Sequence, residues 1–115
     1  MGHNLKGKSS VITGGGSGIG KAISMEFASA GANVFILDYN EETAKNTVEE
    51  ITLAGGKARF FGCDVTKKEQ VDKIMVEITA ESSIDILVNN AGIAHIGNVE
   101  NTNEEDLDRI YEVNI

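Results

Sequence analysis

The stretch "TGGGSGIGK" (residues 13–21) places five glycines among nine residues. Glycine weakens both strands and helices, so a run this dense indicates a local need for bare backbone. The apolar "SSVI" precedes the stretch, and Ile19, Ala22, Ile23 and Phe27 recur after it at helical spacing. A strand, a glycine turn and a helix in this order are typical of a loop that holds phosphate against main-chain N–H groups.

Two common nucleotide-loop patterns fail here, and a third fits. The P-loop pattern G-x-x-x-x-G-K-[ST] matches as far as Lys21, but Ala22 has no hydroxyl for a magnesium ion. The dinucleotide pattern G-x-G-x-x-G fails because Ile19 stands where a glycine is needed. An ATPase is therefore a disfavoured alternative. The pattern that fits is T-G-x-x-x-G-x-G, carried by Thr13, Gly14, Gly18 and Gly20.

Composition and charge limit the class of protein. A length of 115 residues suits one small domain, and 41% apolar residues suffice for a packed core. The net charge of −8 argues against nucleic acid as a partner. No run of 18 apolar residues occurs, and the first residues lack the apolar core of a signal peptide. With Cys63 as the single cysteine, we expect a cytoplasmic protein without disulfides. Acidic pairs at helix starts and on solvated faces predict no metal site.

Four apolar segments predict buried strands, and amphipathic segments alternate with them. The strand segments are "SSVIT", "NVFILD", "KARFFGCD" and "IDILVNN" (residues 9–13, 33–38, 57–64 and 84–90). Helices are predicted over residues 18–30, after a cap at Asn40, and after capping boxes that begin at Thr66 and Thr102. Leu107, Ile110, Tyr111 and Asn114 recur at helical spacing and predict that the last helix buries this stripe.

This alternation predicts an α/β fold with a doubly wound parallel sheet. Right-handed crossovers favour the strand order 3-2-1-4 for the four strands. Ligands of such sheets bind above the carboxyl ends of the strands, at the switch point between strands 1 and 4. The glycine run ends strand 1 and "NNAG" (residues 89–92) ends strand 4. Both segments are therefore expected at one crevice.

Taken together, these motifs resemble the classical short-chain dehydrogenase/reductase family. The residues that carry the resemblance are the glycine pattern of residues 13–20, then Asp38, Asp64-Val65, residues 89–92 and Asn114. The resemblance covers the whole chain. It implies a Rossmann-type fold, binding of NAD or NADP, and hydride transfer between the nicotinamide and an alcohol or ketone.

Each position in the glycine turn has a physical role in holding a diphosphate. Gly14 allows a tight turn, Gly18 admits the pyrophosphate close to the backbone, and Gly20 allows the helix to approach the strand. Ser17 can add a hydroxyl donor, and Ile19 belongs to the same cofactor-binding turn. The first N–H groups of the helix then face the anion, assisted by the helix dipole.

Asp38 ends the second strand, where a ribose would lie. Its carboxylate can accept hydrogen bonds from the 2′- and 3′-hydroxyls and would repel a 2′-phosphate. Tyr39 and its neighbours offer no cation for such a phosphate, so we expect NAD rather than NADP. The resemblance further implies that Asp64 meets the adenine amino group and that Val65 lines the adenine plane.

The fourth strand and the last helix supply the remaining predicted site residues. Asn90, Ala91 and Gly92 are expected near the nicotinamide-side ribose, whereas Asn89 is expected to brace the strands. The predicted helical stripe buries the amide of Asn114, which would then need partners. The resemblance makes Asn114 the active-site asparagine, whose carbonyl holds a water in a proton relay.

The family's chemistry also uses a serine and a Tyr-x-x-x-Lys pair, which follow the active-site asparagine. Tyr39 and Tyr111 are the only tyrosines, and neither is followed by lysine four residues later. We therefore interpret residues 1–115 as the dinucleotide-binding part of a dehydrogenase domain whose remainder is absent. Strand 4 would then be an unpaired edge, so we expect residues 1–115 to form a homo-oligomer, to keep the missing half noncovalently, or to aggregate. A dinucleotide-binding module without turnover is the alternative interpretation.

Overall fold

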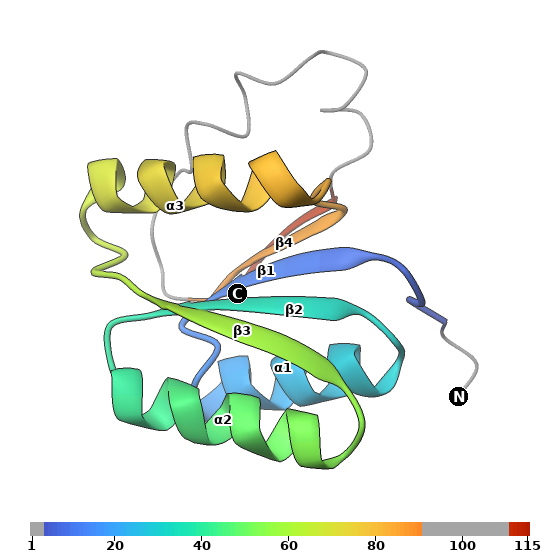
Figure 1. The fold of residues 1–115 in the computed structure, drawn as a ribbon. Helices are drawn as coiled ribbons and strands as arrows, with labels where there is room; N and C mark the ends of the chain where they lie inside the picture. Colours follow the sequence, from blue (N-terminus) through green and yellow to red (C-terminus); the bar gives the residue numbers. More distant parts are fainter. Residues whose placement is uncertain (1–3, 91–110) are drawn as a thin grey trace.

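A five-stranded parallel sheet lies between two helical layers in residues 4–90 and 111–115, the part of the chain that the computed structural model describes. Helices α1 and α2 cover one face of the sheet and α3 covers the other (Figure 1). The strand order β3-β2-β1-β4-β5 confirms the predicted order 3-2-1-4 and adds a fifth strand. Along the chain the elements are β1 (Ser9–Thr13), α1 (Gly18–Ser29), β2 (Asn33–Asp38), α2 (Glu41–Leu53), β3 (Lys57–Gly62), α3 (Lys68–Glu81), β4 (Ile86–Asn89) and β5 (Tyr111–Asn114).

Two apolar cores form because successive residues of each strand point to opposite faces. On β1, Val11 packs in the core beneath α3, while Ile12 packs in the core beneath α1 and α2. Leu87 and Val88 divide in the same way on β4. These strands read as continuous apolar runs because both faces of the sheet are covered.

The start of α2 agrees with the sequence prediction, and the start of α3 does not. Asn40 caps α2, and its side-chain oxygen accepts a hydrogen bond from Thr43 N (3.1 Å). The predicted capping box at Thr66 is wrong, since α3 begins at Lys68 and Lys67 holds the cap position without a side-chain bond. Thr66 instead donates its N–H and hydroxyl to Asp64 Oδ1 (3.0 and 2.6 Å). The Asp64 carboxylate thus forms a turn with Thr66, and Thr66 does not act as the cap of α3.

β3 also ends earlier than predicted. The strand stops at Gly62, although Cys63 N still donates to Asp38 O (3.0 Å). Asp64 N then donates to the Gln70 side chain (3.0 Å), which turns the chain towards α3. Asp64 therefore belongs to the connection after the strand.

The largest correction concerns residues 111–114, which were predicted as helix and form β5. β5 is parallel to β4, with Val113 opposite Val88 and Asn114 opposite Asn89. Tyr111 and Val113 are exposed, so the buried helical stripe predicted at Tyr111 and Asn114 does not form. The predicted edge at β4 is wrong for the same reason, because β5 satisfies the main-chain groups of β4. The capping box at Thr102 lies outside the described residues.

Two further features complete the fold. No helix among the described residues is long and apolar enough to cross a membrane. A polar hollow of about 410 Å³ lies at the amino end of the sheet, lined by residues including Lys6, Lys8 and Asp85. Asp85 is already engaged there, since its Oδ2 accepts from Ser9 N (2.9 Å). The predicted nucleotide site lies at the opposite, carboxyl end of the strands.

Candidate functional site

The glycine turn after β1 has the backbone conformation that its sequence predicts. Gly14 and Gly18 have φ of +65° and +56°, values that residues with a side chain rarely adopt. A Cβ at Gly18 would meet no heavy atom within 4 Å, so this part of the turn faces open space. Ser17, Gly18 and Ile19 are exposed, and the turn is therefore accessible to a ligand.

Gly20 marks the place where α1 approaches the end of β1. A Cβ at this position would overlap the carbonyl oxygen of Gly14 and lie 2.7 Å from Asn90 Nδ2. Asn90 Nδ2 donates to the same Gly14 oxygen (3.1 Å), so the ends of β1 and β4 are joined beside the helix. The absence of a side chain at Gly20 lets these three segments meet.

Thr13 and Asn89 brace the two central strands beneath the turn. Both side chains are buried, and Thr13 Oγ1 lies 3.3 Å from Asn89 Oδ1. The Thr13 hydroxyl also accepts a hydrogen bond from Asn90 N (3.0 Å). These contacts hold the start of the "NNAG" segment against the glycine turn.

Asp38 lies beside the turn at the end of β2. Its Oδ2 accepts a hydrogen bond from Gly16 N (3.0 Å), and its Oδ1 accepts from Asn40 N (3.0 Å). An ionised carboxylate has about four acceptor sites, so these two bonds leave capacity for further donors. Tyr39 follows with 77% of its surface exposed.

Asp64 and Val65 lie at the same edge of the sheet, after β3. Hydrogen bonds from the Thr66 side chain and backbone lower the pKa of the Asp64 carboxyl. Val65 packs against the core beneath α3, so only part of its side chain is accessible. The described contacts do not join either residue to the glycine turn.

The structure brings together only some of the predicted site residues. Gly14, Gly20 and Asn90 meet through the contacts above, and Asp38 is bonded to the same turn at Gly16 N. Ala91 and Gly92 lie outside the described residues. Asn114 lies in β5 and not in a helix, but its register opposite Asn89 places it at the carboxyl edge of the sheet.

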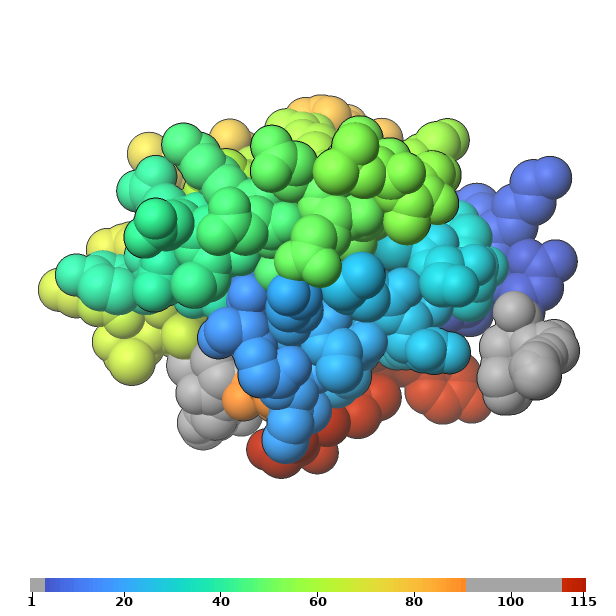
Figure 2. Space-filling view, turned by 90° about the horizontal axis from the view of Figure 1, so that it is seen from below, coloured from blue at the N-terminus to red at the C-terminus, as the bar shows by residue number. Residues whose placement is uncertain are grey.

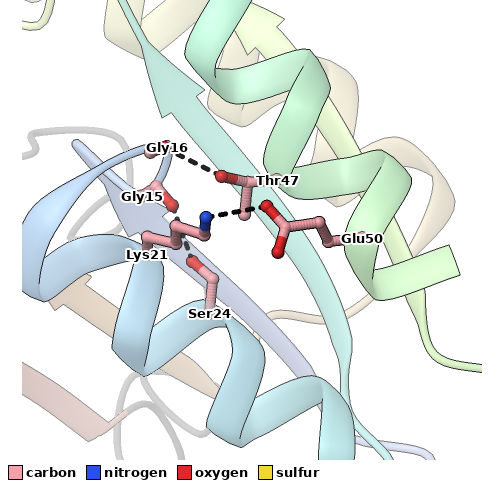
Figure 3. A network of polar contacts seen from close by, with 6 residues as sticks. All are labelled: Gly15, Gly16, Lys21, Ser24, Thr47 and Glu50. Carbon is pink, nitrogen blue, oxygen red and sulfur yellow. Dashed lines mark hydrogen bonds and ion pairs between the residues drawn. The ribbon is translucent and has the colours of Figure 1, made fainter. Parts of the chain in front are cut away.

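Two buried hydroxyls that the sequence prediction missed also contact the turn (Figure 3). Ser24 Oγ on α1 lies 3.1 Å from Gly15 O, and Thr47 Oγ1 on α2 donates to Gly16 O (2.8 Å). Ser24 lies on the buried face of α1 with Ala28, and Thr47 lies on the buried face of α2 with Ala44. A polar residue on an otherwise apolar stripe was the available signal.

Charged side chains lie on both sides of the turn. The first turn of α1 itself contains no acidic residue, whereas the Asp38 carboxylate accepts a hydrogen bond from Gly16 N in the preceding turn. Lys21, the residue that a P-loop would aim at phosphate, pairs with Glu50 (2.7 Å). Among the described residues, no three His, Cys, Asp or Glu side chains are grouped to bind a metal.

Comparison with known proteins identifies the family. The family model described as short chain dehydrogenase matches residues 8–115. The chain belongs to the short-chain dehydrogenase family. It is 50% identical over 113 residues to an uncharacterized oxidoreductase of Thermotoga maritima, covering 97% of this chain and 44% of that protein. It is 42% identical over 106 residues to cyclopentanol dehydrogenase of Comamonas, covering 91% of this chain and 42% of that protein. The chain thus spans less than half the length of these short-chain dehydrogenase relatives.

Solved structures of the short-chain dehydrogenase family superpose on the described fold. A citronellol catabolism dehydrogenase of Pseudomonas aeruginosa matches with a TM-score of 0.75 and 34% identity, over 88% of this chain and 45% of that one. An oxidoreductase from Haemophilus influenza with bound NAD has a TM-score of 0.69 and 33% identity, over 75% of this chain and 31% of that one. A metagenomic short-chain oxidoreductase in complex with NADP has a TM-score of 0.74 and 34% identity, over 81% and 42%.

Proposed function

We propose that residues 1–115 form the dinucleotide-binding part of an NAD-dependent oxidoreductase. The single observation that carries the proposal is the hydrogen bond between Gly16 N and Asp38 Oδ2 (3.0 Å). It places a carboxylate suited to ribose hydroxyls directly beside a turn suited to a diphosphate. NAD contains both groups.

The residues of the turn fit the diphosphate of such a cofactor. A helix leaves its first N–H groups without acceptors of its own, and Gly18 and Ile19 at the start of α1 are exposed. Gly18 adds open space beside these groups. Gly14, Ser17, Ile19 and Gly20 complete the proposed diphosphate-binding turn.

Asp38 favours NAD over NADP by charge. A carboxylate that accepts from ribose hydroxyls would repel the 2′-phosphate that NADP carries there. Lys21, the cation on the neighbouring helix, is already paired with Glu50. The family itself includes structures with either cofactor, so the choice rests on Asp38.

We assign the adenine to Asp64, Val65 and Tyr39, and the nicotinamide-side ribose to Asn90, Ala91 and Gly92. The bound nicotinamide supplies hydride transfer, and the substrate is proposed to be a secondary alcohol or ketone, as the name of the cyclopentanol dehydrogenase relative suggests. Asn114 at the carboxyl edge of β5 is the proposed catalytic contribution of this chain. Without a Tyr-x-x-x-Lys pair in residues 1–115, we expect cofactor binding without turnover.

Calorimetric titration with NAD, NADP and ATP tests this proposal. We expect NAD to bind more tightly than NADP by about tenfold or more, which corresponds to about 1.4 kcal/mol. ATP should bind weakly, because Ala22 supplies no hydroxyl to a magnesium ion. Equal affinity for NAD and NADP would contradict the role of Asp38, and the absence of dinucleotide binding would contradict the function.

A matched pair of variants isolates the charge of Asp38. Asp38→Asn keeps an oxygen that can accept from Gly16 N but removes the charge, so it should narrow the ratio of NADP to NAD dissociation constants. Asp38→Ala removes both the charge and the bond to the turn, so it should also weaken NAD. If Asp38→Asn left the ratio unchanged, charge would not determine the choice of cofactor.

A further inference from the structure

The main-chain carbonyls of Gly15 and Gly16 are held from the protein side of the turn. Ser24 Oγ lies 3.1 Å from Gly15 O and 2.8 Å from Gly20 O, so its one hydroxyl proton is shared between two carbonyls. Thr47 Oγ1 donates to Gly16 O (2.8 Å). Ser24 is 0% and Thr47 1% exposed, so neither hydroxyl has water as an alternative partner.

Close packing makes these two contacts possible. A Cβ at Gly15 would lie 2.9 Å from Ser24 Oγ, and a Cβ at Gly16 would lie 2.9 Å from Ala44 Cα. With side chains at these positions, the turn would stand away from α1 and α2. Figure 3 shows Ser24 and Thr47 reaching the turn from the two helices.

Because the two carbonyl groups are held, the directions of the N–H groups of Gly16 and Ser17 are also set. The peptide bonds around Gly16 are trans, so the N–H of each peptide points opposite to its C=O. With Gly15 O towards Ser24, the N–H of Gly16 points to Asp38, where the structure shows its hydrogen bond. With Gly16 O towards Thr47, the N–H of Ser17 points away from α2, at the exposed start of α1.

We propose that Ser24 and Thr47 are positioning residues that orient the turn for the diphosphate of a dinucleotide. A peptide flip at Gly16 would turn a carbonyl oxygen towards the anion and remove a donor from it. Thr47 opposes this flip directly, and Ser24 holds the preceding peptide, whose N–H donates to Asp38. Both contacts order the turn before the ligand arrives, which reduces the ordering that binding must supply. This proposal rests on the proposed dinucleotide function and adds two residues that do not touch the ligand.

The test compares Thr47→Val and Ser24→Ala with the unaltered protein. Valine keeps the branched shape of threonine and has a methyl group in place of the hydroxyl, so it cannot donate to Gly16 O. We expect each variant to raise the dissociation constants of NAD and ADP-ribose about 3- to 10-fold, the range that one net hydrogen bond supports. Adenosine, which has no phosphate, should bind each variant within about twofold of the unaltered protein, measured by NMR titration.

Two further variants separate positioning from a general loss of structure. Thr52→Val makes the same substitution at an exposed position of α2, where it removes the bond from Thr52 Oγ1 to Val48 O (2.8 Å), and it should leave NAD affinity unchanged. Thr47→Ser keeps the hydroxyl and should restore NAD affinity to within about twofold. If Thr47→Val failed to fold, Ser24→Ala compared with Thr52→Val would decide the question.

The outcomes distinguish this proposal from the proposed function. If the unaltered protein binds no dinucleotide, the proposed function fails, and the amide resonances of Gly16 and Ser17 still report whether Thr47→Val reorients the turn. If the unaltered protein binds NAD and both variants bind it equally well, the positioning proposal alone is overturned. A parallel loss of adenosine and NAD affinity would also overturn it, because the effect would then not be specific to the diphosphate.

Discussion

Gly20 has room for a hydrogen atom and nothing larger, so adding a single methyl group there should change the stability of the protein. By helix propensity alone, Gly20→Ala should stabilise α1 by about 1 kcal/mol. The overlap with Gly14 O predicts the opposite sign, a loss of about 1–3 kcal/mol in the free energy of unfolding. Urea unfolding measures the difference, with exposed Ser29→Ala on the same helix as the control. A more stable Gly20→Ala protein would contradict the packing described here.

Cys63 gives a prediction about alkaline pH. Burial, and secondarily the Asp64 carboxylate, raise the pKa of the Cys63 thiol. A raised pKa in the folded state means that the unfolded chain loses this proton first, so stability should fall as the pH rises past the ordinary cysteine pKa of about 8.5. Cys63→Ala should show a smaller loss of stability between pH 8 and pH 10 in urea titrations. An identical alkaline slope would contradict the shift.

The candidate site shows how far residue patterns reach. Residues at the ends of neighbouring parallel strands must meet at one edge, so Gly14, Asp38 and Asn90 could be placed together from the sequence. Ser24 and Thr47 could not be assigned to the turn, because their partners are main-chain carbonyls whose direction depends on the folded turn. Hydrophobic periodicity carries no information on that direction.

At the scale of elements, strands that are buried on both faces were predicted most accurately. β1 and β2 begin and end at the predicted residues, Ser9–Thr13 and Asn33–Asp38. The helix prediction for residues 111–114 was wrong because two patterns overlap there. Tyr111 and Val113 alternate as in a strand, while Tyr111 and Asn114 also fit a helical stripe. A short pattern cannot separate the two periods. The pairing with β4 decides between them, and it comes from residues more than twenty positions earlier in the chain.

The position of β5 predicts weak protection of its backbone. β1 lies between β2 and β4 with its residues buried, whereas every residue of β5 is exposed. Local opening should therefore free the amide of Val113 at a lower free energy than that of Val11. Hydrogen exchange should be faster at Val113 by at least about tenfold, or about 1.4 kcal/mol. Equal exchange rates would indicate that β5 is covered in solution.

At the scale of the whole molecule, the outer edge of β5 is the proposed site of self-association. Tyr111 N donates to Asp85 O and Ile115 N donates to Asn89 O, so the alternate residue Glu112 turns its N–H and C=O outward. Figure 2 shows β5 in red at the border of the face that α1 and α2 cover. Within residues 4–90 and 111–115 no strand pairs with this edge, and an edge of this kind can pair with a second copy.

Sedimentation at several concentrations tests the association. We expect the unaltered protein to associate as concentration rises. Glu112→Pro should remain monomeric, because proline removes an outward N–H and no bond to β4. Glu112→Ala keeps this N–H and should associate like the unaltered protein. A protein that stays monomeric at every concentration would contradict self-association through β5.

The bond between Asp38 and Gly16 has a consequence for any attempt to exchange one coenzyme for the other. A basic residue in place of the carboxylate would supply a counterion for the 2′-phosphate of NADP, and it would also remove the hydrogen bond that holds the proposed diphosphate-binding turn. Such a variant would favour NADP over NAD but would bind both coenzymes more weakly. The sounder route keeps an acceptor at position 38 and brings the new positive charge from a neighbouring position such as Tyr39.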